Sequence, residues 1–558
     1  GGARPDFVFQ GPWNFANGAP IFEQIEVDPL TGGPTQSARY YRESDYGLFV
    51  QDDWKFRPNL TINLGLRWDY YGPPSEAHRH LENVIPPTNP NDSLINAVAI
   101  LPEHMYNGTW RNFGPKLGFA WSPTMFHNKA VLRGGFGIAY DRFDDVSFDN
   151  TRSNPPLVAS YGICCGTSSN PFVNGQILYE LGSSNSPLGF AANPALATPI
   201  DPATNLPQIL PGQGAPNVWS NPVNNPVPYI YEYSLQVQYA LPQDWVATVG
   251  YTGSSSHKLL RIKNLGFFFA PPPSGAPPLE VNAVFTPTPD TNANYNALDT
   301  QVEHRFTHGF TVNFAYTYSK SIDQVSAEGP GFTTNQTFPT DDATERGPSD
   351  YDATHQFRAV VLWDLPIFRG RNDLLGKTLG GWQINSIFQF HSGFPWTPVT
   401  SNNCFTLGAQ FLCPVRPTAY LGGAKNNHNT EAFLPPVSGN FPNGATSYFT
   451  VNAPVPSFPG VGRNSFRGPR YSDFDFSFVK RFGLPAMPFV GENSNLELRL
   501  DLFNAFNKLN LAPFTFGSAS TTVSFFNNNG VPVANPQFGT ATSGLAGRVV
   551  QLEARFVF

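Results

Sequence analysis

Three observations predict an all-β protein that crosses a membrane as an antiparallel β-barrel. Strand-length segments alternate apolar and polar residues, the chain is 14% aromatic but only 13% charged, and short connections alternate with long ones. In residues 310–319, Phe, Val, Phe, Tyr and Tyr alternate with small or polar residues. This alternation is typical of a strand with lipid on one side and water on the other.

The composition argues against a helical membrane protein. A spanning helix needs roughly 20 consecutive apolar residues, whereas apolar runs such as Phe267–Ala270 and Ala359–Trp363 are far shorter. The mean hydropathy is −0.26, as a barrel allows, because only alternate residues of its strands face lipid. The 50 Gly and 55 Pro residues indicate extensive irregular connections.

About thirteen segments have the pattern of spanning strands, each near the roughly 9–11 residues that a tilted strand needs. They are residues 45–56, 59–71, 112–122, 129–141, 230–240, 244–253, 295–306, 309–319, 355–365, 380–391, 471–482, 493–506 and 547–558.

The connections between these segments predict the orientation. In outer-membrane barrels short turns face the periplasm and long loops face outward. The last strand then runs toward the periplasm, and residues 1–44 form an extracellular segment before the first descending strand. The tight connections are 57–58, 122–128, 241–243 and 307–308, and the long ones are 72–111, 142–229, 254–294, 320–354, 392–470 and 507–546.

An odd strand number and an external start predict an incomplete barrel, because complete single-chain barrels have an even number and start inside. Residues 45–558 are therefore expected to be the carboxy-terminal part of a larger barrel. Its first strand would lack a neighbour, and unpaired backbone groups in lipid cost several kcal/mol each. A soluble sandwich or propeller is disfavoured, since neither explains the alternating loop lengths.

No sequence motif indicates catalysis, so we expect neither an enzyme nor a cofactor. GxSxG, HExxH and Walker-type phosphate loops are missing from the sequence. The net charge of −7 is spread without a basic run, so a nucleic-acid partner is not expected. In an oxidising compartment Cys404 and Cys413 could form a disulfide, while Cys164 and Cys165 could be bridged or reduced.

Metal binding is not expected either. Two histidine pairs, His78 with His80 and His304 with His308, lack further ligands at a suitable spacing. One acidic stretch offers oxygen ligands for calcium but lacks the order of a calcium loop, so a solvated external loop is favoured. That stretch contains Asp341, Asp342, Glu345, Asp350 and Asp352.

Charged residues on the polar side of the strands form the predicted functional surface. They would line the lumen with both signs of charge and hydrogen-bond one another and a separate plug domain. These residues are Lys116, Arg133, Glu232, Asp299, Glu303, Arg305, Arg358, Asp473, Asp475, Glu497, Arg499, Asp501, Glu553 and Arg555.

Several segments resemble the barrels of TonB-dependent outer-membrane receptors, particularly the Oar-like group. The resemblance extends over nearly the whole chain and is carried by Tyr46–Lys55 with Pro58–Trp68, Gly114–Trp121, Glu345–Asp352, Leu496–Asn507 and Gln551–Phe558.

The resemblance implies a 22-stranded barrel that is closed by an amino-terminal plug and imports a scarce ligand with energy from the inner-membrane TonB complex. It also implies that the barrel assembly machinery reads the terminal aromatic residues Phe556 and Phe558. No plug or TonB box is recognisable in this sequence, as expected of a carboxy-terminal barrel portion.

Two functions follow for a protein of the bacterial outer membrane. The first is TonB-dependent uptake of a bulky extracellular ligand such as a siderophore, glycan or peptide. The second is adhesion or surface binding, with the barrel as an anchor in outer-membrane lipid and no energised transport. A passive porin is disfavoured, because a wide barrel without a plug would leak.

Overall fold

The computed structural model describes most of the chain between residues 6 and 557. The residues that it leaves out within these limits are 10, 36–37, 90, 144–148, 165–195, 210–214, 271–273, 275–280, 308, 327–341, 369–370, 372, 400–404, 408–409, 413–415, 418, 421–448, 451–460, 484–493, 516–517, 527–531 and 536.

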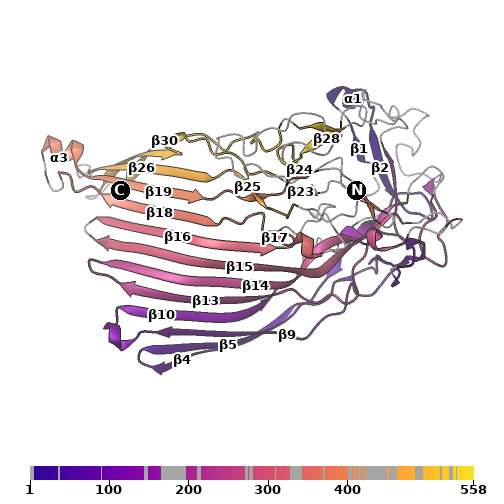
Figure 1. Ribbon diagram of the computed structural model, residues 1–558, viewed down its shortest axis with the longest axis horizontal. Helices are drawn as coiled ribbons and strands as arrows, with labels where there is room; N and C mark the ends of the chain where they lie inside the picture. The colour runs from indigo at the N-terminus through magenta and orange to yellow at the C-terminus, as the bar shows by residue number, and fades with distance from the viewer. Residues whose placement is uncertain are drawn as a thin grey trace.

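Thirteen strands follow one another in a single antiparallel sheet (Figure 1), and they correspond to the thirteen predicted segments. Strands consecutive in the chain are neighbours in the sheet. They are β4 (Tyr46–Arg57), β5 (Leu60–Tyr70), β9 (Asn112–Trp121), β10 (Ala130–Tyr140), β13 (Tyr229–Ala240), β14 (Trp245–Asn264), β15 (Ala283–Thr307), β16 (Phe310–Asp323), β18 (His355–Asp364), β19 (Trp382–His391), β26 (Tyr471–Gly483), β27 (Asn495–Phe503) and β30 (Val549–Val557).

The two ends of the sheet differ. At the turn end, where Figure 1 marks the C-terminus, tight connections such as those between β4 and β5 and between β15 and β16 join the strands. At the opposite loop end, the connections are long. The connection between β18 and β19 departs from the predicted alternation, since it lies at the turn end but contains a short helix, α3 (Leu374–Leu379).

Strands β14 and β15 are much longer than predicted. The predicted loop 254–294 is largely strand, because β14 continues to Asn264 and β15 begins at Ala283. Their outer halves are rich in Ser, Thr and Asn and pair with each other beyond the end of β13, where His257 stands opposite Tyr229. The sequence did not predict these outer halves as strands, because they lack the alternation of apolar and polar residues that is typical of a membrane-spanning strand.

The sheet is open in the described chain. Strands β4 and β30 are its two edges, and all twelve residues of β4 are exposed. An exposed strand of this length presents unpaired backbone donors and acceptors along one side.

The pairing register separates an apolar face from a polar face. Leu500 stands opposite Phe478 and Leu552, whereas its neighbour Arg499 stands opposite Val479 and Glu553. Opposite residues in an antiparallel pair point to the same face, so the alternation is carried from strand to strand. Many apolar side chains on the first face are exposed, including Leu552 at 79%. Lipid is the solvent that suits such a face.

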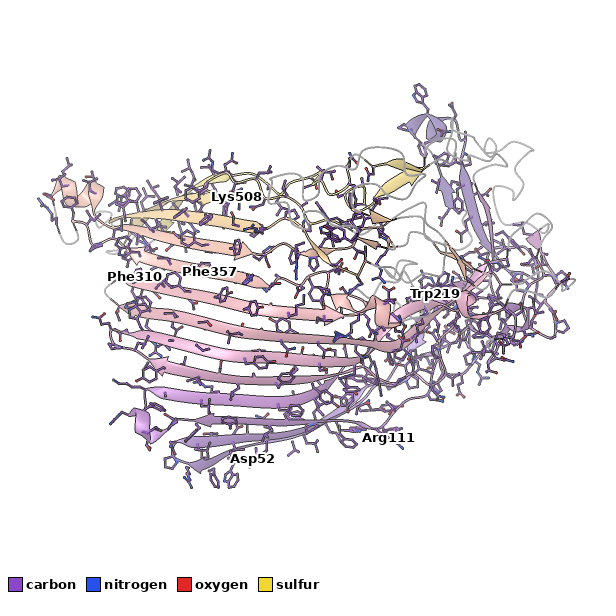
Figure 2. The ribbon with its side chains drawn as sticks, viewed as in Figure 1. Asp52, Arg111, Trp219, Phe310, Phe357 and Lys508 are labelled. Atoms are coloured by element: carbon purple, nitrogen blue, oxygen red, sulfur yellow. The ribbon has the colours of Figure 1, made fainter. Side chains whose placement is uncertain are left out.

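Aromatic residues gather on the apolar face near the turn end. Phe310 pairs with Trp363 there, and Figure 2 shows Phe310 close to that end while Phe357 lies farther along the sheet. A band of aromatic side chains at this level is typical of the membrane–water interface. The register places Trp54, Trp121, Tyr239, Trp245, Phe310, Trp363 and Trp382 in this band.

A folded loop layer caps the loop end. We define it as the described residues of 6–45, 71–111, 141–228, 258–291, 320–354, 392–470 and 504–548. Its small strands are β1 (Asp6–Val8), β2 (Phe22–Val27), β3 (Tyr41–Arg42), β6 (Ser75–Glu76), β7 (Asn83–Ile85), β8 (Val98–Ile100), β11 (Ala159–Cys164), β12 (Asn217–Trp219), β17 (Gly347–Pro348), β20 (Pro395–Trp396), β21 (Phe405–Leu407), β22 (Gln410–Leu412), β23 (Ala419–Tyr420), β24 (Phe449–Thr450), β25 (Phe466–Arg467), β28 (Ser524–Phe526) and β29 (Pro532–Ala534).

Helices in the described part of the chain are few and short. Besides α3, they are α1 (Pro12–Ala16) and the 3-10 turns η1 (Leu94–Asn96), η2 (Thr124–Phe126), η3 (Asn150–Ser153), η5 (Leu265–Phe268) and η6 (Asp342–Glu345). Among the described residues, no helix has both the length and the apolar character needed to cross a membrane.

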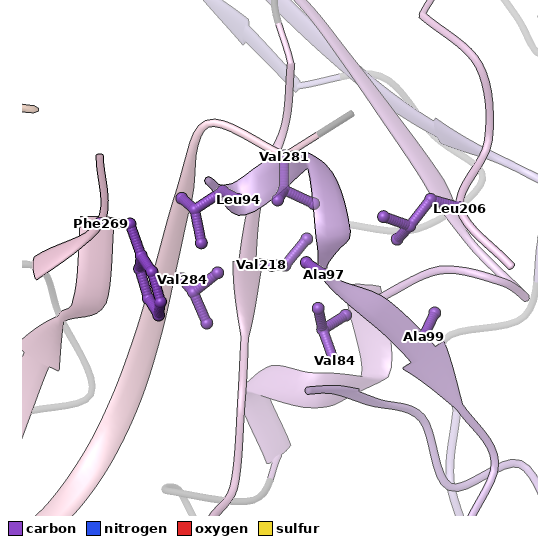
Figure 3. Packing of buried hydrophobic residues seen from close by; sticks show 9 residues of the cluster. All are labelled: Val84, Leu94, Ala97, Ala99, Leu206, Val218, Phe269, Val281 and Val284. Carbon is purple, nitrogen blue, oxygen red and sulfur yellow. The ribbon is translucent and has the colours of Figure 1, made fainter. Parts of the chain in front are cut away.

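The hydrophobic cores lie in the loop layer. The largest cluster gathers nine buried residues from β7, η1, β8, β12, β15 and the segments between them (Figure 3). Val84, Ala97 and Val284 in this cluster are completely buried. A second cluster surrounds Trp396 and Phe466. The loop layer thus buries its own apolar surface as a water-soluble domain does.

The two faces make a testable prediction. Replacing Leu500 with Arg should destabilise the intact protein by about 2–4 kcal/mol, because a charge then faces hydrocarbon. Replacing Arg499 with Gln should cost less, since Arg499 faces away from lipid and its Nε donates to Asp501 Oδ1 at 2.8 Å. Unfolding of both variants from lipid bilayers measures the difference. A larger loss for Arg499→Gln would contradict the assignment of the faces.

Candidate functional site

The register places thirteen of the fourteen predicted lumen residues on the polar face. The exception is Arg305, which lies where the register between β15 and β16 shifts and has no opposite partner. The thirteen are Lys116, Arg133, Glu232, Asp299, Glu303, Arg358, Asp473, Asp475, Glu497, Arg499, Asp501, Glu553 and Arg555.

Charges of opposite sign are neighbours on this face. Arg499 Nε donates to Asp501 Oδ1 at 2.8 Å and to Ser477 Oγ at 3.0 Å. Glu497 accepts from Arg481 Nε at 2.8 Å and stands opposite Arg555. The face is therefore a mixed-sign polar surface, which offers hydrogen bonds to a polar partner without a strong field of either sign.

A second charged region lies in the loop layer, around the acidic stretch at 342–352. The expectation of a solvated loop is wrong for two of its described residues, because Glu345 and Asp352 are buried. The carboxylates of the stretch pair with basic side chains. Asp342 pairs with Arg261, Glu345 with Arg416 and Asp352 with Arg467. No group of three potential metal ligands occurs in the described part of the chain.

A deeply buried pair joins the sheet to the 392–470 loop segment. Arg463 Nη1 donates to Asp323 Oδ1 at 2.7 Å, and the two side chains are only 4% and 2% exposed. Asp323 is the last residue of β16, and Arg463 lies 140 residues later. Removing one member of such a pair would leave a buried charge without compensation.

Asp352 forms a second junction between the same elements. Its Oδ1 accepts from the backbone N–H of Ser321 at 2.6 Å, and its Oδ2 accepts from Arg467 Nη2. Arg467 Nη2 also donates to Thr354 Oγ1 at 3.1 Å. The Gly347–Asp352 segment is thus fixed between β16 and the 461–469 segment.

Ion pairs elsewhere in the loop layer shift acid–base equilibria. Burial alone would raise the pKa of Asp290, but hydrogen bonds from Arg261 and Lys263 hold it below the usual value. At Glu82, burial raises the pKa to about 7, against the lowering effect of the Arg39 guanidinium. Loop segments distant in sequence are therefore joined by charged contacts that water reaches poorly.

Sequence analysis did not single out the arginines of these junctions. Arg261, Arg416, Arg463 and Arg467 are far in sequence from the carboxylates they meet, so spacing carries no signal. The one available hint was the occurrence of two arginines in the otherwise uncharged Gly- and Pro-containing segment 453–469.

Of the predicted assembly signal and the predicted disulfide, only Phe556 lies in the described part of the chain. Phe556 lies in β30 on the apolar face, opposite Leu496, and is 43% exposed. Phe558 lies outside the described residues, as do both members of the predicted disulfide, Cys404 and Cys413.

Comparison with known proteins gives one family match. Residues 20–551 match the family model described as "Outer membrane beta barrel domain". No curated protein matches the chain.

Solved structures similar to this chain include several outer-membrane transporters. The transporter YddB from Escherichia coli is 9% identical, with 96% of this chain and 54% of that one covered and a TM-score of 0.40. The FrpB iron transporter from Neisseria meningitidis is 11% identical, with 95% of this chain and 50% of that one covered and a TM-score of 0.39. A mutant ferric enterobactin receptor from Pseudomonas aeruginosa is 10% identical, with 95% of this chain and 50% of that one covered and a TM-score of 0.39. The chain spans about half the length of these structures.

The buried pair at Asp323 leads to a stability prediction. Replacing Arg463 with Ala should cost about 3–5 kcal/mol locally, because the Asp323 carboxylate stays buried without its partner. Hydrogen exchange of the intact protein in detergent should then show faster exchange in residues 321–323 and 347–352.

Arg371→Ala is the matched control. Arg371 also pairs with an aspartate, Asp373, but the two side chains are 52% and 45% exposed. An exposed pair contributes about 0–1 kcal/mol, so this variant should exchange like the wild type. Equal protection of residues 347–352 in all three proteins would show that the buried pair does not hold the segment.

Proposed function

Because this chain belongs to the outer membrane beta barrel domain family, we propose that it forms wall and ligand-facing loops of a TonB-dependent receptor of the Oar-like group. It is a protein of the bacterial outer membrane. In this proposal the protein is a non-enzymatic receptor that takes up a bulky ligand across that membrane. The single observation that carries the proposal is the combination of a lipid-compatible sheet with a folded, ion-paired loop layer at one end.

The width of the sheet supports a plugged receptor over a simple pore. Thirteen consecutive strands do not yet close the sheet. Barrels of 16–18 strands already enclose an aqueous channel, and 22-stranded transporters hold a plug in the lumen. The mixed-sign polar face suits hydrogen bonding to a plug domain. The thirteen charged residues on this face, which include Lys116 and Arg555, would line the lumen.

The segments that resemble TonB-dependent receptors support the same assignment. Tyr46–Lys55 and Pro58–Trp68 form the β4–β5 hairpin, and Leu496–Asn507 contains β27. Glu345–Asp352 contributes three of its acids to ion pairs or hydrogen bonds in the loop layer. In such a receptor the TonB complex would act through the plug, and the assembly machinery would read Phe556 and Phe558.

We further propose that the loop end faces the exterior and the turn end faces the periplasm, as in other outer-membrane barrels. Residues 6–44 would then be extracellular. Their contacts support this, because β2 pairs with β11 and β3 pairs with β6, both within the loop layer.

Surface binding without energised transport is the second candidate. The outer halves of β14 and β15 favour it, because this ribbon continues beyond β13 into the loop layer. A protein that contacts a surface needs such projecting, folded loops more than it needs a lumen.

Uptake measurements separate the two candidates. Cells with and without the complete gene would be incubated with labelled ferric siderophores, neutral oligosaccharides and peptides, each with and without a protonophore. The receptor proposal expects at least one compound whose accumulation requires both the gene and an energised inner membrane.

The other outcomes of the same experiment contradict the receptor proposal. Gene-dependent label that stays on the cell surface and is insensitive to the protonophore would support surface binding instead. Gene-dependent accumulation that the protonophore does not reduce would indicate passive diffusion.

A further inference from the structure

The apolar face of β16 changes character toward the loop end. Every second residue of a strand points to the same face. On the apolar face these residues are, in order, Phe310, Val312, Phe314, Tyr316, Tyr318 and Lys320. The order from apolar residues through tyrosines to a cation matches the order of hydrocarbon, interface and headgroup in a membrane.

The depth of Lys320 agrees with the level of lipid headgroups. Phe310 belongs to the aromatic band at the turn end, and Lys320 lies ten residues farther along β16. Ten residues advance roughly 34 Å along a strand, and a tilt of about 40° reduces this to roughly 26 Å across the membrane. The apolar band of such barrels is about 25 Å tall, so Lys320 lies where the hydrocarbon ends.

Arg346 brings a second cation to the same place. Its Nη2 donates to Asn294 Oδ1 at 3.3 Å. Asn294 lies two residues from Asn296, and Asn296 stands opposite Lys320. Residues two apart on one face of a strand are separated by roughly 7 Å. Both cations therefore lie over the same short stretch of β15, and we call Asn294, Asn296, Lys320 and Arg346 the outer patch.

Among the described residues, the acids near the two cations are already paired. Asp342 and Glu345, which are close to Arg346 in the sequence, pair with other arginines. Lys320 is 46% exposed at its side chain, and its Nζ lies 3.4 Å from Asp352 Oδ2. That carboxylate is completely buried and also pairs with an arginine. The exposed surface of the outer patch is therefore positive.

Neutral side chains fix the outer patch and add a donor to it. Asn294 Nδ2 donates to Ser255 Oγ at 2.9 Å. Asn296 Oδ1 accepts from the hydroxyls of Tyr233 at 3.0 Å and Tyr251 at 2.5 Å. The Nδ2 group of Asn296 has no acceptor among the described residues. Because an amide nitrogen only donates, this group is left for an acceptor on a ligand.

An anion fits the outer patch better than a neutral molecule or a cation, because the groups left for a ligand are all donors. They are Lys320 Nζ, Asn296 Nδ2, and Nε and Nη1 of Arg346. Phosphate oxygens accept charge-assisted hydrogen bonds, and arginine can donate two of them in parallel. The patch lies on the face that lipid covers, so a lipid headgroup fits better than a soluble anion.

We propose that the outer patch binds a phosphate group of a membrane lipid. Lys320 and Arg346 supply the two positive charges, and Asn296 Nδ2 donates a further hydrogen bond. Tyr316 and Tyr318 then lie at the level where headgroup and acyl chains meet. With the loop end outside, the lipid belongs to the outer leaflet. This inference concerns the membrane side of the wall and goes beyond the proposed uptake of a ligand.

Native mass spectrometry of the intact protein, released from a non-ionic detergent, tests this site. The protein would be titrated with diphosphoryl lipid A, with the same lipid after removal of its phosphates, and with diphosphoryl lipid A plus inorganic phosphate. The measured quantity is the lipid concentration at which half of the protein carries one lipid. We expect this concentration to be at least tenfold lower for the phosphorylated lipid, because only its phosphates accept charge-assisted hydrogen bonds.

Two double variants test the residues. Lys320→Gln with Arg346→Gln should weaken binding of diphosphoryl lipid A roughly tenfold or more, because hydrogen bonds to a charged group are lost. Lys320→Arg with Arg346→Lys keeps both charges and should bind within about threefold of the wild type, since either side chain can donate to phosphate. Unchanged heat-induced mobility on gels would verify that each variant is folded.

Lys129→Gln with Arg371→Gln is the matched control. It removes one exposed lysine and one exposed arginine from the connections at the turn end. The same total charge is lost, but the outer patch is untouched. This variant should therefore bind diphosphoryl lipid A like the wild type.

Four outcomes would overturn the proposal. They are equal binding of the lipid with and without phosphates, wild-type binding by folded Lys320→Gln with Arg346→Gln, an equal loss in the turn-end control, and displacement of the lipid by equimolar inorganic phosphate. The uptake experiment succeeds or fails separately. Energised uptake in a protein that does not bind the lipid would retain the receptor and reject the outer patch. Lipid binding without energised uptake would retain the patch and reject the transporter.

Discussion

In hydrocarbon, a backbone N–H or C=O group finds no solvent partner, so a spanning residue must bond to a neighbouring strand. This constraint explains the architecture of the wall. The thirteen strands pair in chain order, which makes short turns sufficient at one end. The apolar face needs no protein core, because lipid covers it. In the described part of the chain, the buried hydrophobic clusters lie in the loop layer, which folds against water.

The loop layer uses a different principle from the wall. Its segments come from widely separated parts of the chain and meet through buried ion pairs such as Arg463–Asp323 and Arg467–Asp352. Desolvation makes such pairs weak contributors to net stability, yet an unpaired member is strongly unfavourable. Alternative loop arrangements would leave these charges unpaired. The pairs therefore specify one arrangement of the loop segments.

The strands of the wall were predictable from the sequence. Lipid covers one face of the sheet and water the other, so apolar and polar residues alternate along each strand. Segments such as 496–502 and 310–318 show this period clearly, and their faces agree with the register. The loop layer was not predictable in this way. The outer half of β15 looked like a loop because the loop layer covers it, so residues 283–287 are all buried and show no alternation with a period of two. Asp352 looked solvated because its partner Arg467 is 115 residues away.

The length of the β14–β15 hairpin has a mechanical consequence. The ladder between β14 and β15 runs from Trp245 opposite His304, near the turn end, through the wall to Asn264 opposite Phe285, inside the loop layer. A pull on the loop layer along the strand axis loads this ladder in shear, so many hydrogen bonds share the force at once. Loops joined only by single segments would transmit the same force through one backbone. The hairpin therefore acts as a tether that resists tension between the cap and the wall.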